Sequence, residues 1–150
     1  MEVRSILILG DSLSKGVVYD REKQRYCYAK DSFVKTMQNF LCPTVHNKAK
    51  FGATIEYGSS LLVPKMREID PQVVLIEFGG NDCDFDWNAI AENPFADHRP
   101  KTEIPVFEAH LTQMIEQVRD FGKVPVLMNL PPLNAPAYFR WFTQGDAKKA

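Results

Sequence analysis

The sequence predicts an α/β fold, in which a parallel sheet is covered by helices on both faces. Near-continuous aliphatic runs are typical of strands buried on both sides. They alternate with segments whose apolar residues recur every three or four positions, the spacing of amphipathic helices. This alternation requires right-handed crossovers between parallel strands. Because 150 residues is the size of one domain, we expect residues 1–150 to form a single unit.

Four strands are expected, and each is followed by residues that favour turns. The first apolar run stops abruptly at Gly10-Asp11, and the third stops at Gly79-Gly80. The second run is the weakest of the four. The expected strands are residues 5–9, 44–49, 73–78 and 124–130.

Three amphipathic helices are expected between these strands. The first is capped by Asp31 or Ser32, the second follows Gly52, and the third is capped by Thr102. A loop of about twenty residues is expected between the third strand and the third helix. The helices end at Pro43, at Asp70-Pro71 and at Gly122.

The charge balance and the apolar segments exclude several classes of function. Lys and Arg number 18 against 19 for Asp and Glu, so the net charge of -1 gives no field that attracts nucleic acid or an anionic membrane. No apolar run reaches the roughly 20 residues that span a bilayer. The N-terminus has no secretory signal pattern, which favours a cytoplasmic location. Cys27, Cys42 and Cys83 have no zinc or disulfide spacing and are expected to be free thiols.

The residues that follow the strands predict a site for acyl transfer. In a parallel sheet these residues meet beyond the carboxyl ends of the strands. Ser12 after the first strand is a candidate nucleophile, and a glycine and an asparagine after the next two strands can donate hydrogen bonds. The four segments are Gly10-Asp11-Ser12-Leu13, Phe51-Gly52-Ala53, Gly79-Gly80-Asn81-Asp82 and Pro131-Pro132-Leu133-Asn134.

In these segments the sequence resembles the SGNH hydrolases, also called the GDSL family of esterases and lipases. The first family block matches Gly10-Asp11-Ser12-Leu13, the glycine block matches Gly52, and the G-x-N-D block matches residues 79–82. The likeness extends over essentially all 150 residues, including Leu130-Pro131-Pro132. It implies a flavodoxin-like, three-layer α/β/α fold and hydrolysis of carboxylic esters through an acyl-serine intermediate.

The resemblance also assigns roles within the site. Ser12 would be the nucleophile, and the Ser12 N–H, the Gly52 N–H and the Asn81 side chain would form the oxyanion hole. No metal and no organic cofactor would be needed. The supporting residues would be Gly10, Asp11, Gly79 and Asp82.

One family block is missing from the chain. The D-x-x-H block carries the histidine that deprotonates the serine and the aspartate that orients it, and none of His46, His98 and His110 has an aspartate three positions before it. A fifth strand of the family is missing as well. We therefore expect a C-terminally truncated chain that is inactive or weakly active. The alternative is a non-catalytic binding module, a pseudoenzyme, on the same fold.

A metal or phosphate site at Asp82, Asp84 and Asp86 is a further alternative. The spacing resembles a calcium loop, but Trp87 stands where that loop needs glycine and Asn93 where it needs glutamate. A solvated acidic loop is the simpler interpretation. No nucleotide-binding glycine motif follows the first strand.

The expected partner is a small-molecule ester, which could be a lipid, an acetylated sugar, a thioester or an aryl ester. Aromatic residues of the long loop and of the C-terminal part could line the pocket for it. The fourth strand would form an apolar edge of the sheet, and such edges pair with other chains. A homo-oligomer through this edge is therefore expected, unless residues 138–142 cover it. The aromatic and histidine candidates for the pocket are Phe85, Trp87, Phe95, His98, Tyr138 and Trp141.

Overall fold

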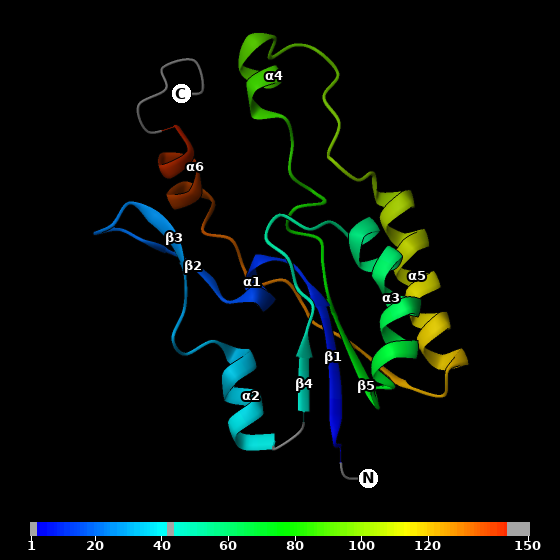
Figure 1. The fold of residues 1–150 in the computed structure, drawn as a ribbon. Coiled ribbons are helices and arrows are strands. Elements are labelled where there is room, and N and C mark those ends of the chain that lie inside the picture. Colours follow the sequence, from blue (N-terminus) through cyan, green and yellow to red (C-terminus); the bar gives the residue numbers. More distant parts are fainter. Residues whose placement is uncertain (1–2, 42–43, 144–150) are drawn as a thin grey trace.

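A computed structural model of the chain describes residues 3–41 and 44–143. It contains a four-stranded parallel sheet, a separate antiparallel hairpin and six helices among these residues (Figure 1). The elements in chain order are β1 (Ser5–Gly10), α1 (Ser12–Lys15), β2 (Val17–Asp20), β3 (Arg25–Tyr28), α2 (Phe33–Leu41), β4 (Thr44–Asn47), α3 (Ile55–Ile69), β5 (Val73–Glu77), α4 (Trp87–Glu92), α5 (Ile104–Asp120), β6 (Val124–Leu127) and α6 (Ala135–Thr143).

The sheet has the order β4-β1-β5-β6, and all three neighbouring pairs are parallel. The first strand of the chain therefore lies inside the sheet, and the chain reverses its direction of winding there. In sheets of this kind ligands bind beyond the carboxyl ends of the strands at the reversal. The turn after β1 occupies that position.

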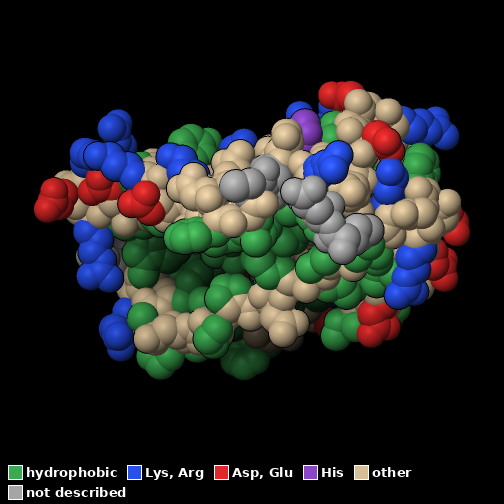
Figure 2. All heavy atoms as spheres, turned by 90° about the horizontal axis from the view of Figure 1, so that it is seen from below, with side chains coloured by type: hydrophobic (Ala, Val, Ile, Leu, Met, Phe, Trp, Pro, Cys, Tyr) green, Lys and Arg blue, Asp and Glu red, His purple; other side chains and the backbone are tan. Residues whose placement is uncertain are grey.

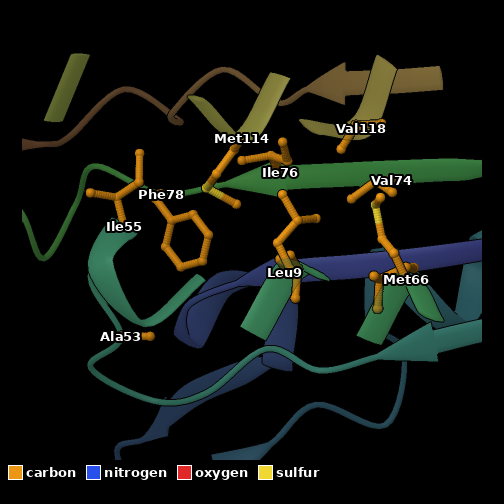
Figure 3. Packing of buried hydrophobic residues seen from close by; sticks show 11 residues of the cluster. Leu9, Ala53, Ile55, Met66, Val74, Ile76, Phe78, Met114 and Val118 are labelled. Atoms are coloured by element: carbon orange, nitrogen blue, oxygen red, sulfur yellow. The ribbon is translucent and has the colours of Figure 1, made fainter. Parts of the chain in front are cut away.

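The larger core lies between the sheet and the pair of helices α3 and α5, which run side by side in Figure 1. Leu9, Val74 and Ile76 point from the strands toward Met66 on α3 and Met114 on α5 (Figure 3). All five side chains are at most 2% exposed. This cluster fixes the position of β1 and β5, and hence of the turns at their ends.

The opposite face of the sheet is covered less completely. Val34 of α2 packs with Ile8 and Leu75 into a smaller buried cluster. Leu75 is paired in register with Val126 of β6, so both point to this face, yet Val126 is 40% exposed. From below, the molecule shows a hollow walled by hydrophobic side chains (Figure 2).

The three expected helices and the four expected strands are all present, with some corrections at their ends. The second strand stops at Asn47 and the fourth at Leu127, because Lys48 and Met128 continue beside the sheet with only single backbone hydrogen bonds to it. Of the two expected caps for α2, Ser32 accepts a hydrogen bond from the Lys35 N–H (3.4 Å). Glu103, not Thr102, precedes the first residue of α5.

Five elements were not expected from the sequence. The strands β2 and β3 form a hairpin of polar and tyrosine-rich segments, α1 is only four residues long, and α4 lies inside the predicted loop. The fifth is α6, which contacts the hairpin through Tyr19 and Trp141. The expected covering of the fourth strand by residues 138–142 is not reflected in the exposure of β6, since Leu127 is 49% exposed. Cys42 lies outside the described residues, and Cys27 and Cys83 are free. Among the described residues, no helix has the length and apolar character to cross a membrane.

Candidate active site

The candidate nucleophile lies in the tight turn that joins β1 to α1. Asp11 caps α1, because its Oδ1 accepts a hydrogen bond from the Leu13 N–H (2.8 Å). Ser12 is the first residue of the helix and is half-buried. Its hydroxyl makes no hydrogen bond with the described residues. The side chain is therefore accessible for a reaction at the end of the sheet.

Gly10 has a steric role in this turn. A Cβ atom built on it would lie 2.7 Å from Ser14 Oγ and 2.8 Å from Glu77 Oε2, which is closer than real Cβ contacts. Any side chain at position 10 would push the turn away from the sheet. The glycine of the first block therefore allows the backbone of the turn to approach β5.

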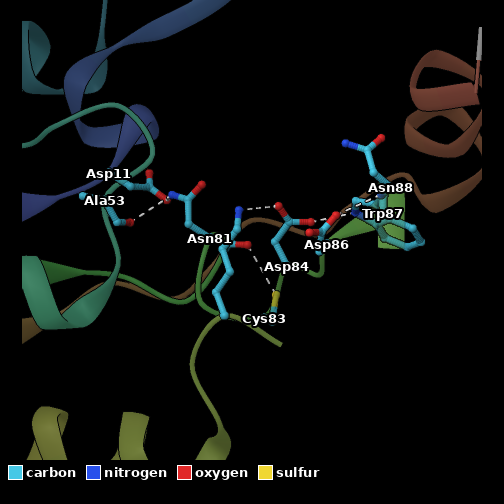
Figure 4. Close-up of polar contacts among 10 residues, drawn as sticks. Asp11, Ala53, Asn81, Cys83, Asp84, Asp86, Trp87 and Asn88 are labelled. Atoms are coloured by element: carbon cyan, nitrogen blue, oxygen red, sulfur yellow. Dashed lines mark hydrogen bonds and ion pairs between the residues drawn. The ribbon is translucent and has the colours of Figure 1, made fainter. Parts of the chain in front are cut away.

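Asn81 joins three of the predicted segments. Its Nδ2 donates to Asp11 Oδ2 (2.9 Å) and to the backbone oxygen of Ala53 (3.0 Å), as Figure 4 shows. The turn after β1, the loop after β4 and the loop after β5 thus meet at one side chain. Both amide hydrogens of Asn81 are occupied, so one of these two bonds must be released before Asn81 can donate to a substrate oxygen.

Gly52 lies in the loop beside the nucleophile turn. The Lys50 N–H donates to Gly10 O (3.0 Å), which holds this loop against the end of β1. Gly52 has φ 71°, a left-handed conformation that favours glycine, and a Cβ atom there would meet nothing within 4 Å. The residue is exposed, and its N–H has no partner among the described residues, so a ligand can reach it.

Asp82 fixes the segments at the starts of two helices, α3 and α5. Its carboxylate accepts from the Ile55 N–H (3.0 and 3.2 Å) at the start of α3 and from Thr102 Oγ1 (2.7 Å) before α5. It is 2% exposed. The supporting role expected for Asp82 is consistent with these bonds, and Thr102 is a positioning partner that the sequence did not indicate.

The three acidic residues of the alternative metal site have separate partners. Asp84 pairs with Lys101 Nζ (2.7 Å) and accepts from Trp87 Nε1 (2.8 Å), and these bonds hold its pKa below the ordinary value although burial opposes the change. Asp86 caps α4 by accepting from the Asn88 and Ala89 N–H groups (Figure 4). Within residues 3–41 and 44–143, no cluster of three or more His, Cys, Asp or Glu side chains could hold a metal ion.

Glu77, at the end of β5, is a member of the site that the sequence analysis missed. It is fully buried, and its Oε2 accepts from Ser14 Oγ (2.9 Å) and from the Asp11 N–H (3.2 Å). Burial, followed by the nearby Asp11 carboxylate, raises the pKa of Glu77 to about 7. Burial also raises the pKa of Asp11. A single carboxyl group in the otherwise apolar run of residues 73–78 was the available signal.

The three histidines lie apart from Ser12 in their contacts. His98 Nε2 lies 2.7 Å from the backbone oxygen of Asn93. His46 lies on β4 and is paired in register with Leu7, and His110 lies on α5 with a buried Nδ1 that has no partner among the described residues. None of these contacts places a base at the nucleophile.

Aromatic side chains of the hairpin, α4, α6 and the loop after β4 contact one another. Tyr19 of the hairpin contacts Trp141 of α6 (6.2 Å between ring centroids), and Phe142 of α6 contacts Trp87 of α4 (5.2 Å). We call the set Tyr19, Tyr26, Phe51, Phe85, Trp87, Tyr138, Trp141 and Phe142 the aromatic rim. It joins segments that are far apart in the sequence.

An apolar pocket of about 420 Å³ lies behind the loop that carries Asn81. Gly79, Cys83 and Phe85 of this loop form one wall, and Phe107 and Leu130 form another. Of the aromatic residues expected to line a pocket, Phe85 and Trp87 line one of about 550 Å³ together with Arg99. Phe95 is 97% exposed and lines neither of the two.

Comparisons with known proteins agree on one family. The GDSL-like lipase/acylhydrolase family model matches residues 8–149. No curated protein sequence matches the chain significantly.

Three solved structures with the same fold are distant in sequence. TesA has a TM-score of 0.61 at 24% identity, over 94% of this chain and 69% of its own. The psychrotrophic esterase EstA from Pseudoalteromonas sp., inhibited by monoethylphosphonate, has a TM-score of 0.57 at 21% identity, over 97% and 71%. The lipase/acylhydrolase from Enterococcus faecalis has a TM-score of 0.61 at 18% identity, over 97% and 65%. The chain therefore spans about two thirds of the length of these relatives.

Proposed function

The chain belongs to the GDSL-like lipase/acylhydrolase family, and from this membership we propose that it is a serine hydrolase of carboxylic esters with Ser12 as its nucleophile. The observation that carries the proposal is the pair of hydrogen bonds from Asn81 to Asp11 and Ala53, which gathers the three family blocks around one turn. A fold alone hosts many functions, and the nucleophile candidate beside these three segments is what supports acyl transfer here.

The chemistry follows from the positions of these groups. Ser12 Oγ attacks the ester carbonyl and loses its proton to a base, the alcohol leaves with a proton, and water then hydrolyses the acyl-serine ester. The N–H groups of Ser12 and Gly52 would bind the negatively charged oxygen of the tetrahedral intermediate. Asn81 would join them after its amide turns away from Asp11 or Ala53.

The 150 residues do not supply an evident base for Ser12. It contains no D-x-x-H block, and its three histidines make their contacts elsewhere. Triad enzymes without their base keep only about 10³ to 10⁴ of rate over water, from binding and the oxyanion hole. We therefore propose weak activity for the 150-residue chain, on a small ester that can reach the aromatic rim. The cytoplasmic location expected from the sequence stays a prediction.

Hydrolysis of p-nitrophenyl acetate tests the proposal. The chain is compared with Ser12→Ala and with the control Ser60→Ala, whose exposed hydroxyl only donates to Tyr57 O (2.8 Å). We expect slow hydrolysis that Ser12→Ala abolishes and Ser60→Ala leaves unchanged. Equal rates in all three proteins would contradict a catalytic Ser12.

Asn81→Ala tests the oxyanion hole separately. Removal of one such donor costs roughly 2.7 to 4 kcal/mol of barrier, so we expect the Ser12-dependent rate to fall about a hundredfold or more. A loss of less than about threefold would exclude this role for Asn81.

The alternative function is a binding module that keeps the crevice without catalysis. The amide of Asn81 favours it, because both of its hydrogens are bonded within the chain and neither points to a substrate. Calorimetric binding of a non-hydrolysable ester analogue, without any Ser12-dependent turnover, would support the binding module over the hydrolase.

A further inference from the structure

Glu77 is a buried acid to which the acyl-transfer chemistry assigns no task. It closes β5, is 0% exposed, and lies opposite Gly10 of β1 in the sheet register. Its Oε2 accepts two hydrogen bonds, but Oε1 is buried without a partner among the described residues. Burial of a carboxyl group with an unsatisfied oxygen is costly, so its presence under the nucleophile turn calls for a role.

The two donors to Glu77 lie on either side of Ser12 in the sequence. The Asp11 N–H comes directly before the nucleophile and the Ser14 hydroxyl follows two residues later, and both reach the same oxygen. The backbone oxygen of Ser14 in turn accepts from Asn47 Nδ2 (2.7 Å) of β4. The turn is thus attached to the sheet from both sides of Ser12.

We propose that Glu77 is a positioning residue for Ser12, whose gain or loss of a proton changes the hydrogen bonds that hold the nucleophile turn. The inference rests on the proposed role of Ser12. When Glu77 is ionised, its two hydrogen bonds become charge-assisted and stronger. When it is protonated, they become ordinary neutral bonds and the turn is held less firmly.

The surroundings of Glu77 place this change near neutral pH. The groups that face it from β1 and α1 are Gly10 and Ser14, which are both neutral, apart from Asp11. Burial is the largest cause that raises the pKa of Glu77 to about 7, and the carboxylate of Asp11 adds to it. The Asp11 carboxylate also accepts a hydrogen bond from Asn81, the proposed oxyanion donor. The protonation state of Glu77 is therefore linked, through Asp11, to the strength of that hydrogen bond.

Amide NMR of the ¹⁵N-labelled chain between pH 5.5 and 8.5 tests the inference. We expect the Asp11 amide resonance to move downfield with a midpoint near pH 7 as Glu77 ionises. Glu77→Gln keeps an acceptor of the same shape and cannot ionise, so this midpoint should disappear while the Asp11 amide stays protected from hydrogen exchange. Glu68→Gln is the matched control, since Glu68 is an exposed partner of Lys65 and should leave the midpoint unchanged.

Ser14→Ala provides a second variant in case Glu77→Gln does not fold. It removes one of the two donors that favour the ionised form, so the midpoint should move to higher pH. The proposal would be overturned if the Asp11 amide resonance of the unmodified chain showed no midpoint between pH 5.5 and 8.5. It would also be overturned if Glu77→Gln or Ser14→Ala showed the same midpoint as the unmodified chain. The readout does not require Ser12 to react, so absence of ester hydrolysis would overturn the proposed function alone.

Discussion

The centre of the sheet and its β6 edge have similar apolar sequences but very different surroundings. Leu7, Ile8 and Leu9 of β1 are 0% exposed, whereas Val124, Val126 and Leu127 of β6 are 40 to 49% exposed. Neighbouring strands and helices cover β1 on all sides, while β6 has one strand neighbour among the described residues. The comparison shows that an apolar run predicts a strand. How much that strand contributes to the free energy of unfolding depends on how far the tertiary structure buries it.

Substitution of one leucine by alanine in each region measures the difference in their contributions to the free energy of unfolding. Leu9→Ala should lower the free energy of unfolding by about 3 kcal/mol, because it leaves a cavity in the main core. Leu127→Ala should lower it by about 1 kcal/mol or less, since half of that side chain already contacts water. Urea unfolding followed by circular dichroism checks both values, and equal losses would mean that β6 is covered in solution.

The next largest effect is the change in stability with pH that the buried carboxyl group of Glu77 causes in the centre of the sheet. The pKa of Glu77 is about 7 in the folded chain against 4.5 in its ordinary state, so folding favours its protonated form. The stabilisation is fully present below about pH 4.5 and is lost as the pH rises through 7, by about 3 kcal/mol in total. Asp11, whose pKa is also raised, acts in the same direction.

Urea midpoints between pH 5 and 8 test this dependence. The unmodified chain should lose stability over this range, and Glu77→Gln should lose much less of it. Asp20, Glu68 and Asp84 have lowered pKa values and titrate below this range, so they should not mask the effect. A flat profile for the unmodified chain would contradict it.

At the edge, the expected consequence is association between chains. The exposed backbone and side chains of β6 are a template for pairing with a second copy, and a lysine on an edge strand prevents such pairing. We expect a concentration-dependent dimer in light scattering that Val126→Lys converts to monomer. Val106→Lys, on the exposed face of α5, is the control and should leave the dimer intact. A monomer at all concentrations would remove this proposal.

The smallest effect belongs to the ion pair that precedes β6. Lys123 Nζ lies 2.5 Å from Asp70 Oδ1, but the Asp70 side chain is 83% exposed. Exposed pairs contribute about 0 to 1 kcal/mol, so Lys123→Gln should lower the free energy of unfolding by less than about 0.5 kcal/mol. A much larger loss in urea unfolding would show that β6 depends on its connection to α3 and not on burial.

The same contrast explains how much of the molecule could be predicted from its sequence. The strands around Leu9 and Ile76 and the helices α3 and α5 have strong periodicity, because each has a face in one core, and they were predicted correctly. The hairpin and α6 were missed, because they are held by a few exposed aromatic contacts that leave no periodic pattern. The fourth strand was predicted three residues too long, because its apolar residues continue beyond the ladder.

The candidate site, too, was predicted only in part from the sequence. The resemblance indicated Ser12, Gly52 and Asn81, and the loops that carry them do meet, although their catalytic roles stay predictions. The sequence did not indicate the occupied amide of Asn81 or the carboxyl of Glu77 under the turn. Both depend on contacts between strands that are neighbours in space and distant in the chain.

The aromatic rim has a consequence for spectroscopy. The chain has two tryptophans, Trp87 and Trp141, and both belong to the rim, while the buried core cluster contains none. Intrinsic tryptophan fluorescence therefore reports on the contacts between the hairpin, α4 and α6 and not on the sheet. If these contacts open before the core unfolds, the fluorescence transition will precede the circular dichroism transition, and the emission spectrum becomes an optical probe of the aromatic rim.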